Sequence, residues 1–290
     1  MVKKMIMLTG ILLLLTGCSG KESEPAFSQE TPPKDLVIIT EEKNQYEFVD
    51  VNGTLYQAEL LEDVPYTAYE KERLIEKDGF KYYTDEEGEI TSKIGVDVSK
   101  YQGEIDWEKV KEAGVDFAMI RLGFRGYGEA GQLVEDEFFK NNIEGALEAG
   151  LEVGVYFFSQ AINEEETIEE ADFVLERIED YDITCPVVFD AEEIKNDEAR
   201  TDHLTNEEFT SNCVTFCDII KEAGYSPMIY ANMTWMAYTL ELQELTQYEK
   251  WYADYEAHPQ CPYAFSMWQY AERGQVPGIQ GKVDLNVWFQ

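Results

Sequence analysis

Residues 153–190, which read VGVYFFSQAINEEETIEEADFVLERIEDYDITCPVVFD, contain the pattern that decides the fold of this chain. Two short apolar runs, 153–158 and 186–190, flank a stretch from 164 to 180 that has the periodicity of an amphipathic helix. Continuous apolar runs of this length are typical of strands covered on both faces, as in parallel sheets. The segment therefore predicts a strand–helix–strand unit.

The same alternation extends outward in both directions. Strands are predicted at 94–98, 117–121 and 228–230, and helices at 106–113, 133–149 and 206–223. Beyond 230 the candidate strands 250–253, 264–268 and 283–287 follow one another without a full amphipathic helix, apart from a short one near 234–247. We expect an α/β fold: an irregular (β/α) barrel over 94–290, with about five βα units and three closing strands.

A different pattern precedes the barrel. Tyr46 and Phe48 alternate with polar residues, and Asn52-Gly53 is typical of a tight hairpin turn. A second hairpin is expected around 80–88. Residues 35–93 are therefore predicted to form a small β-rich unit, which could be a spacer, a cap on the barrel or a wall-binding module.

The first residues, MVKKMIMLTGILLLLTGC, resemble a bacterial lipoprotein signal. Two lysines precede an apolar run that is shorter than the roughly 20 residues of a membrane-spanning helix. We expect a signal peptide at 1–17, lipidation of Cys18, and a polar tether at 18–34 that contains three prolines. The chain would then be anchored to the bacterial cell membrane on its extracytoplasmic side, facing the cell wall. A plain signal peptide that happens to end in cysteine is the alternative.

The composition excludes several classes of function. The chain of 290 residues has 23 Lys and Arg against 59 Asp and Glu, a formal charge of −36, which disfavours nucleic-acid binding. No cofactor motif and no metal-ligand spacing are present, so no cofactor and no metal are expected. The cysteines other than Cys18 are predicted to be buried structural residues, with disulfides left open: Cys185, Cys213, Cys217 and Cys261. We expect a monomer.

Acidic residues follow the predicted strands where a barrel would carry its site. In an α/β barrel the site lies at the carboxyl rim of the strands. Asp190 and Glu192 end one strand at a spacing that places both side chains on the same face. Two such carboxylates suit glycosidic cleavage, because crowding and burial separate their pKa values and one can keep its proton. Ordinary solvated acids at a strand end are the alternative.

Seven ordered stretches from about 94 to 290 resemble glycoside hydrolase family 25, the Chalaropsis-type lysozymes. They are GVDVSKYQ (95–102), VYFFSQA (155–161), VVFDAE (187–192), IYAN (229–232), WYAD (251–254), MWQY (267–270) and VDLN (283–286). The resemblance implies an irregular barrel that cuts the β-1,4 bond between N-acetylmuramic acid and N-acetylglucosamine in peptidoglycan glycan strands. A non-catalytic carbohydrate-binding protein on the same barrel is the alternative function.

The resemblance also implies residue roles. The acid glutamate of the family matches Glu192 and its partner aspartate matches Asp190. Asp97 and Asp284 match two further aspartates at the rim, which we expect to bind sugar and tune charge. Asp190 would attack C1, activate water, or assist the acetamido oxygen of the substrate, the role we favour.

Substrate contacts are expected from the same stretches. Aromatic side chains stack on sugar rings, although each could equally be barrel core. The predicted substrate-binding residues are Tyr101, Tyr156, Gln160, Tyr230, Trp251, Asp254, Trp268 and Gln269. Arg121 and Arg125 are further candidates, as partners of the muramyl carboxylate.

Overall fold

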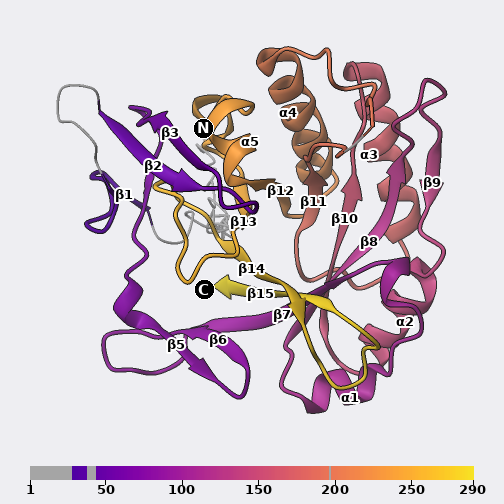
Figure 1. Cartoon of the computed structure of the whole chain (residues 1–290). Coiled ribbons are helices and arrows are strands. Elements are labelled where there is room, and N and C mark those ends of the chain that lie inside the picture. Colours follow the sequence, from indigo (N-terminus) through magenta and orange to yellow (C-terminus); the bar gives the residue numbers. More distant parts are fainter. Residues whose placement is uncertain (1–27, 38–43, 196) are drawn as a thin grey trace, which may run out of the picture.

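Eight strands close into a barrel in the computed structural model, which describes residues 28–37, 44–195 and 197–290 (Figure 1). They are β7 (Ser92–Val98), β8 (Phe117–Arg125), β10 (Glu152–Phe158), β11 (Val187–Asp190), β12 (Pro227–Asn232), β13 (Glu249–Ala253), β14 (Met267–Gly274) and β15 (Val283–Phe289). Each strand pairs with the next, and β15 pairs with β7. The predicted irregular α/β barrel is confirmed.

The directions of the strands decide which residues meet at one rim. All neighbouring pairs from β7 to β14 are parallel, whereas β15 is antiparallel to both β14 and β7. The beginning of β15 therefore lies at the rim where the other strands end. This register places Asp284, near the start of β15, directly opposite Asp97, near the end of β7.

Helices cover the barrel only in part. After β7, β8, β10 and β11 come α1 (Trp107–Glu112), α2 (Phe139–Glu148), α3 (Glu164–Ile178) and α4 (Asn206–Glu222). Between β12 and β13 lie only α5 (Met233–Tyr238) and the 3-10 helix η3 (Leu242–Leu245). Figure 1 shows α1 to α4 on one side of the barrel and the N-terminal strands on the other. No helix in the described part of the chain has the length and apolarity to cross a bilayer.

Local sequence sets the helix ends. Asn163 accepts a hydrogen bond from the Glu166 amide at the start of α3, and Thr205 forms a capping box with Glu208 at the start of α4. Helices α1, α2 and α4 each end in Glu-Ala-Gly. Each glycine takes a left-handed conformation that stops the helix, as Gly150 does with φ 74°.

One predicted helix begins later than its periodicity indicates. Leu133–Glu135, within the predicted helix 133–149, forms strand β9 and pairs antiparallel with Gly123–Arg125 at the end of β8. The helix starts only after Asp136, whose carboxylate accepts the amide of Phe138. The free edge of β8 offers hydrogen bonds that the periodicity of one segment cannot reveal.

Side chains fill the inside of the barrel. Phe117, Met119, Val188, Met228 and Met267 form an apolar cluster that is separate from the core between barrel and helices. A Cβ atom at Gly95 would lie 2.2 Å from the Phe117 ring, so β7 can pass this ring only with a glycine. The barrel is a packed core and not a pore. The four cysteines in the described residues are buried and free.

Short two-stranded sheets precede the barrel. They are β2 (Gln45–Val49) with β3 (Leu55–Glu59), β5 (Leu74–Lys77) with β6 (Phe80–Tyr83), and β1 (Ser28–Gln29) with β4 (Tyr66–Thr67), with the 3-10 helix η1 (Lys71–Arg73) before β5. The hairpin at Asn52-Gly53 is as predicted, with Gly53 at φ 80°. The second predicted hairpin is also present, since residues 85–88 form a tight turn after Tyr83 and Thr84 bridges to Ile90. A further hairpin, β5–β6, turns at Asp78-Gly79.

The end of the predicted tether 18–34 is held in place. Ser28–Gln29 pairs with Tyr66–Thr67, so a free tether would have to end before Ser28. The predicted signal peptide, Cys18 and the first part of the tether lie outside the described residues.

The small sheets pack on the barrel, β2–β3 beside α5 and β5–β6 beside β7 and β15 (Figure 1). Tyr263 of the barrel contacts Tyr46 edge to face and stacks on Tyr66, with ring centroids 6.3 and 5.9 Å apart. The Gln260 side chain donates to the Val49 carbonyl and accepts from the Val49 amide, so it continues the edge of β2. The N-terminal sheets are thus fixed to the part of the barrel that lacks long helices.

Candidate active site

A groove of about 540 Å³ opens at the rim where the parallel strands end. Its walls combine acids, amides and aromatic rings: Asp97, Tyr101, Gln102, Tyr156, Asp190, Glu192, Tyr230, Trp251, Tyr255, Gln269, Glu272, Lys282 and Asp284. All four predicted catalytic carboxylates are among them.

Asp97 and Asp284 form a carboxyl pair. Their side chains hydrogen-bond to each other, and Asp97 Oδ2 also accepts from Asn286 Nδ2 at 2.8 Å and Gln269 Nε2 at 3.0 Å. Burial raises the pKa of Asp97, although the two amide donors oppose this shift. Burial and the nearby charge of Asp97 raise the pKa of Asp284 to about 9. The pair therefore holds one proton near neutral pH.

Asp190 is a buried carboxylate whose Oδ1 has no hydrogen-bond partner in the described part of the chain. Burial raises its pKa well above the ordinary value, and repulsion by Glu192 and Asp97 adds to the shift, whereas Arg121 opposes it. A buried polar atom without a partner requires an explanation. Its place in the groove provides one, because a bound ligand could supply the missing donor.

Glu192 lies two residues beyond Asp190, at the start of the loop that leads to α4. Burial and the charge of Asp97 raise the pKa of Glu192 to about 7, against the opposing effect of Lys195 and Arg121. A substantial fraction of Glu192 thus keeps its proton at neutral pH. Glu192 and Asp190 both line the groove, so a protonated carboxyl lies in the same groove as a second acid.

Aromatic rings form the floor of the groove. Trp251 meets Tyr230 and Tyr156 edge to face, with centroids 4.8 and 5.9 Å apart, and its indole N–H donates to Asn286 Oδ1 at 2.8 Å. Tyr101 lies at the mouth with 77% of its surface exposed. Gln269 Oε1 accepts from the Tyr230 hydroxyl at 3.0 Å, which links this floor to Asp97.

Three predicted substrate-binding residues do not line the groove. Trp268 is fully buried and donates to the Asp254 carbonyl, because neighbours in a strand point to opposite faces and Gln269 takes the inner one. The Asp254 carboxylate accepts from the Tyr252 hydroxyl and the Gln260 amide. Gln160 is buried where it accepts from Thr201. These three side chains are used within the protein.

The predicted role of Arg125 is wrong. Its guanidinium is buried and donates to Glu170 Oε1, the Gly131 carbonyl and the Glu166 carbonyl, each at 2.8 Å. Arg125 is therefore held within the protein and does not line the groove. Arg121 lies closer to the site: its Nε donates to Asp136 Oδ2 at 2.7 Å, and its Cζ lies 5.2 Å from the centre of the Tyr101 ring.

Four residues of the groove were not among the predicted site residues. Gln102 ends the stretch GVDVSKYQ and Tyr255 follows WYAD, so both could have been found from the motifs. Glu272 and Lys282 have no such signal. Glu272 lies near the end of β14 and Lys282 directly before β15, and both ends are at this rim.

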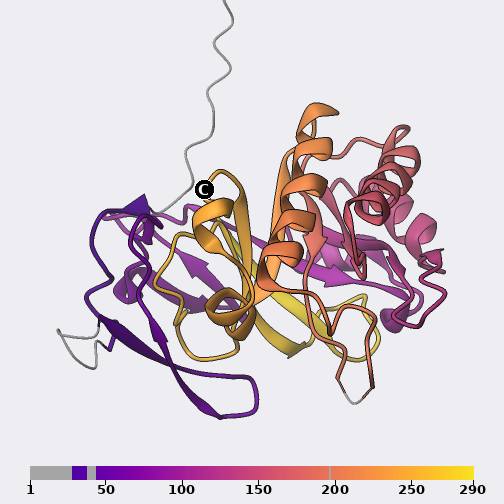
Figure 2. The same cartoon turned by 90° about the horizontal axis from the view of Figure 1, so that it is seen from above.

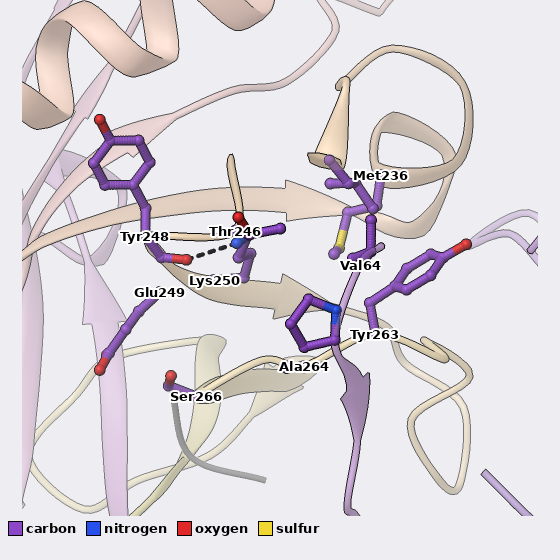
Figure 3. A pocket seen from close by; sticks show the side chains of 11 residues that line it. Val64, Met236, Thr246, Tyr248, Glu249, Lys250, Tyr263, Ala264 and Ser266 are labelled. Carbon is purple, nitrogen blue, oxygen red and sulfur yellow. Dashed lines mark hydrogen bonds between the residues drawn. The ribbon is translucent and has the colours of Figure 1, made fainter. Parts of the chain in front are cut away.

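A smaller pocket lies between the N-terminal sheets and the barrel (Figure 3). Its volume is about 10 Å³, room for a single water. Lys250 Nζ donates there to the carbonyls of Leu245 and Tyr248, and burial lowers its pKa to about 8. This lysine thus provides hydrogen bonds to carbonyls at and just after the C-terminus of η3. The pocket itself has no space for a substrate.

Two family models match parts of this chain. The model of Glycosyl hydrolases family 25 matches residues 96–279, and that of the prokaryotic membrane lipoprotein lipid attachment site matches residues 3–19. The chain is 29% identical to the uncharacterized protein YegX of Escherichia coli over 67% of this chain and 68% of that protein. It is 25% identical to an autolytic lysozyme of Clostridium acetobutylicum, over 66% of this chain and 54% of that enzyme.

Among solved structures, the chain resembles the modular autolysin LytC of Streptococcus pneumoniae, solved in complex with a synthetic peptidoglycan ligand. The TM-score is 0.61 at 25% identity, over 89% of this chain and 58% of LytC. The chain thus spans little more than half the length of the clostridial lysozyme and of LytC. The shared part of this chain is larger than the barrel, so the likeness extends into the N-terminal sheets.

Proposed function

Because this chain belongs to glycosyl hydrolase family 25 and is a glycoside hydrolase, we propose that it cuts peptidoglycan at the β-1,4 bond between N-acetylmuramic acid and N-acetylglucosamine. The observation that carries the proposal is the pairing of Glu192 with Asp190 in one groove. The clostridial lysozyme and LytC with its peptidoglycan ligand support the choice of polymer.

In the proposed reaction Glu192 is the general acid. Its raised pKa keeps a proton available, and this proton passes to the glycosidic oxygen as the bond from that oxygen to C1 breaks. The leaving sugar departs with a new hydroxyl. The positive charge that develops at C1 faces a group of carboxylates, and their negative potential stabilises it.

Asp190 assists the substrate in this scheme. Its unpartnered Oδ1 would accept the N–H of the 2-acetamido group, so that the acetamido oxygen attacks C1 and forms a cyclic intermediate. Water then opens this ring at C1 and gives its proton to the Glu192 carboxylate. Two inversions at C1 leave the β configuration unchanged. If nuclear magnetic resonance of the first product showed the α anomer, direct activation of water by Asp190 would replace this scheme.

Asp97 and Asp284 keep the site negative and contact the sugar, while Tyr101, Tyr156, Tyr230, Trp251 and Gln269 provide the remaining proposed contacts. Asn286 and Gln269 donate hydrogen bonds to the Asp97 carboxylate, so its orientation in the groove is fixed. Since the residues in the groove supply both the proton and the charge, the proposed reaction uses no cofactor.

We propose that the protein acts at the cell wall as a monomer anchored to the outer face of the membrane through Cys18. The lipoprotein attachment-site match over residues 3–19 supports the anchor. Labelling of growing cells with a clickable fatty acid should mark the wild type and leave Cys18→Ala unmarked. The Cys18→Ala protein should also be found in the medium instead of the membrane fraction.

The test of the activity is digestion of purified peptidoglycan, with mass analysis of the new ends. Wild type should release fragments that end in reducing N-acetylmuramic acid. Glu192→Gln should be slower by about 10² to 10⁴, the contribution of a positioned acid. Glu148→Gln, at an exposed carboxylate on α2, is the control and should match wild type. Folded wild type that releases no fragments from walls of several species would refute the proposal, and fragments ending in N-acetylglucosamine would refute the choice of bond.

A further inference from the structure

A second hollow lies beside the groove, between the β2–β3 hairpin and the barrel. Its volume is about 170 Å³. The two parts of the chain contribute to it together: Val49, Asp50, Val51, Asn52 and Tyr56 from the hairpin, and Glu193, Lys195, Asn232, Met233, Thr234, Trp235, Ala253 and Asp254 from the barrel. We call it the hairpin hollow. Figure 2 shows the β2–β3 hairpin and the loop after β11 reaching out on the same side of the molecule.

The hairpin hollow is adjacent to the groove along the rim. Glu192 lines the groove, and the next residue, Glu193, lines the hollow. On β12 the same change occurs between Tyr230, in the groove, and Asn232, in the hollow. A chain-like ligand that passes Glu192 would therefore reach the hairpin.

The hairpin hollow is lined by aromatic and amide side chains, which are typical of sugar-binding sites. Tyr56 and Trp235 are partly exposed rings held by aromatic neighbours, Tyr56 stacked on Phe48 at 5.3 Å and Trp235 against Phe209 at 4.6 Å. Asn232 Oδ1 accepts from the Trp235 amide, while its Nδ2 has no partner among the described residues. Rigid aromatic faces beside a free amide N–H group suit the apolar face and the hydroxyls of a pyranose.

The charge and the size of the hairpin hollow restrict which ligands it can bind. Asp50, Glu193 and Asp254 face a single cation, Lys195, so the lining disfavours an anionic group such as the carboxylates of a stem peptide. The volume is below the roughly 300–1,000 Å³ of sites that enclose a whole ligand. One uncharged sugar residue of a longer chain fits this description.

We propose that the hairpin hollow binds an additional N-acetylhexosamine of the same glycan strand, beyond the two sugars whose bond is cut. The β2–β3 hairpin is then part of the substrate-binding surface, which gives the N-terminal unit a role in selecting long strands. This inference rests on the proposed function, since it takes the strand cut at Glu192 as the ligand.

The experiment compares cleavage of short and long glycan fragments by the full-length protein. Asn52→Ala and Tyr56→Leu should raise KM for fragments of eight or more sugars about fivefold, the change that corresponds to the loss of about 1 kcal/mol of binding. Both variants should cut tetrasaccharides with the KM and kcat of wild type. Gln57→Ala is the matched control, because Gln57 is the next residue on β3 and its side chain bonds to Glu47 outside the hollow.

A second measurement separates binding from turnover and from folding. In a Glu192→Gln background, titration calorimetry with the long fragment should show the same fivefold loss for Asn52→Ala, with an unchanged thermal midpoint. Equal losses on short and long fragments, or none on either, would overturn the inference while leaving the proposed function intact. If the wild type cut neither fragment, the proposed function itself would fail.

Discussion

Replacing Glu192 with glutamine should stabilise the fold at neutral and alkaline pH while it removes activity. Burial and the charge of Asp97 raise the pKa of Glu192 to about 7 in the folded protein, whereas an unfolded glutamate titrates near 4.3. The folded state thus binds the proton more tightly than the unfolded state. The stability that this proton provides is complete below about pH 4.3 and is lost as the pH rises to about 7.

The size of the effect follows from the two pKa values. A difference of about 2.7 pH units at about 1.4 kcal/mol each corresponds to about 3.8 kcal/mol. The Glu192 side chain is partly open to solvent in the groove, which screens its charge. We therefore expect Glu192→Gln to exceed the wild type in free energy of unfolding by about 2 kcal/mol more at pH 8 than at pH 4.5.

The assay is urea unfolding followed by tryptophan fluorescence at both pH values. Taking the difference between variant and wild type at each pH cancels the titration of the other acids. Glu148→Gln, at an exposed carboxylate on α2, is the control variant. The same stability difference for Glu192→Gln at pH 4.5 and pH 8 would show that the carboxyl titrates normally, and the assignment of Glu192 as the acid would lose its physical basis.

Three further outcomes are expected. The rate of wall digestion should fall as the pH rises above about 7 because Glu192 loses its proton; a rate that stays constant to pH 9 would contradict this. Gln269→Leu removes a donor to the Asp97 carboxylate and should lower kcat/KM at least tenfold with the fold retained, measured on glycan fragments; wild-type activity would rule out a positioning role. Arg125→Met leaves the Glu170 carboxylate buried without its partner and should lower the free energy of unfolding by about 3 kcal/mol; the double variant with Glu170→Leu should recover much of this loss.

The barrel could be predicted because its signals are local. Apolar runs and amphipathic stretches recur in order, and the strand ends carry the acids, so Asp97, Asp190 and Glu192 could be placed at one rim from spacing and fold class alone. The hairpin at Asn52-Gly53 was predictable for the same reason, since the turn chemistry is contained in two residues. Asp78-Gly79 carries the same local signal, although it was not among the predicted turns. The bounds of β9 depend on which strand edge is free, and no single segment carries that information.

The sequence could not tell which residues of each motif face the groove and which lie in the core. Gln269 and Trp268 are neighbours in one stretch, yet one binds Asp97 in the groove and the other is sealed under the N-terminal sheets. Strand alternation says that the two face opposite ways but not which of them faces inward. Glu272, near the end of β14, and Lys282, directly before β15, meet at the groove only because the barrel closes through these two strands.

By itself, the sequence determined the barrel and the identity of its carboxylates, because periodicity and strand-end residues are properties of short segments. Only the tertiary structure decided their protonation, since the pKa values of Glu192 and Asp284 depend on burial and on charges brought together from β7, β11 and β15. It also decided that the hairpin lies beside the groove. Neither burial nor the distance between remote segments is written in the spacing of residues along a chain.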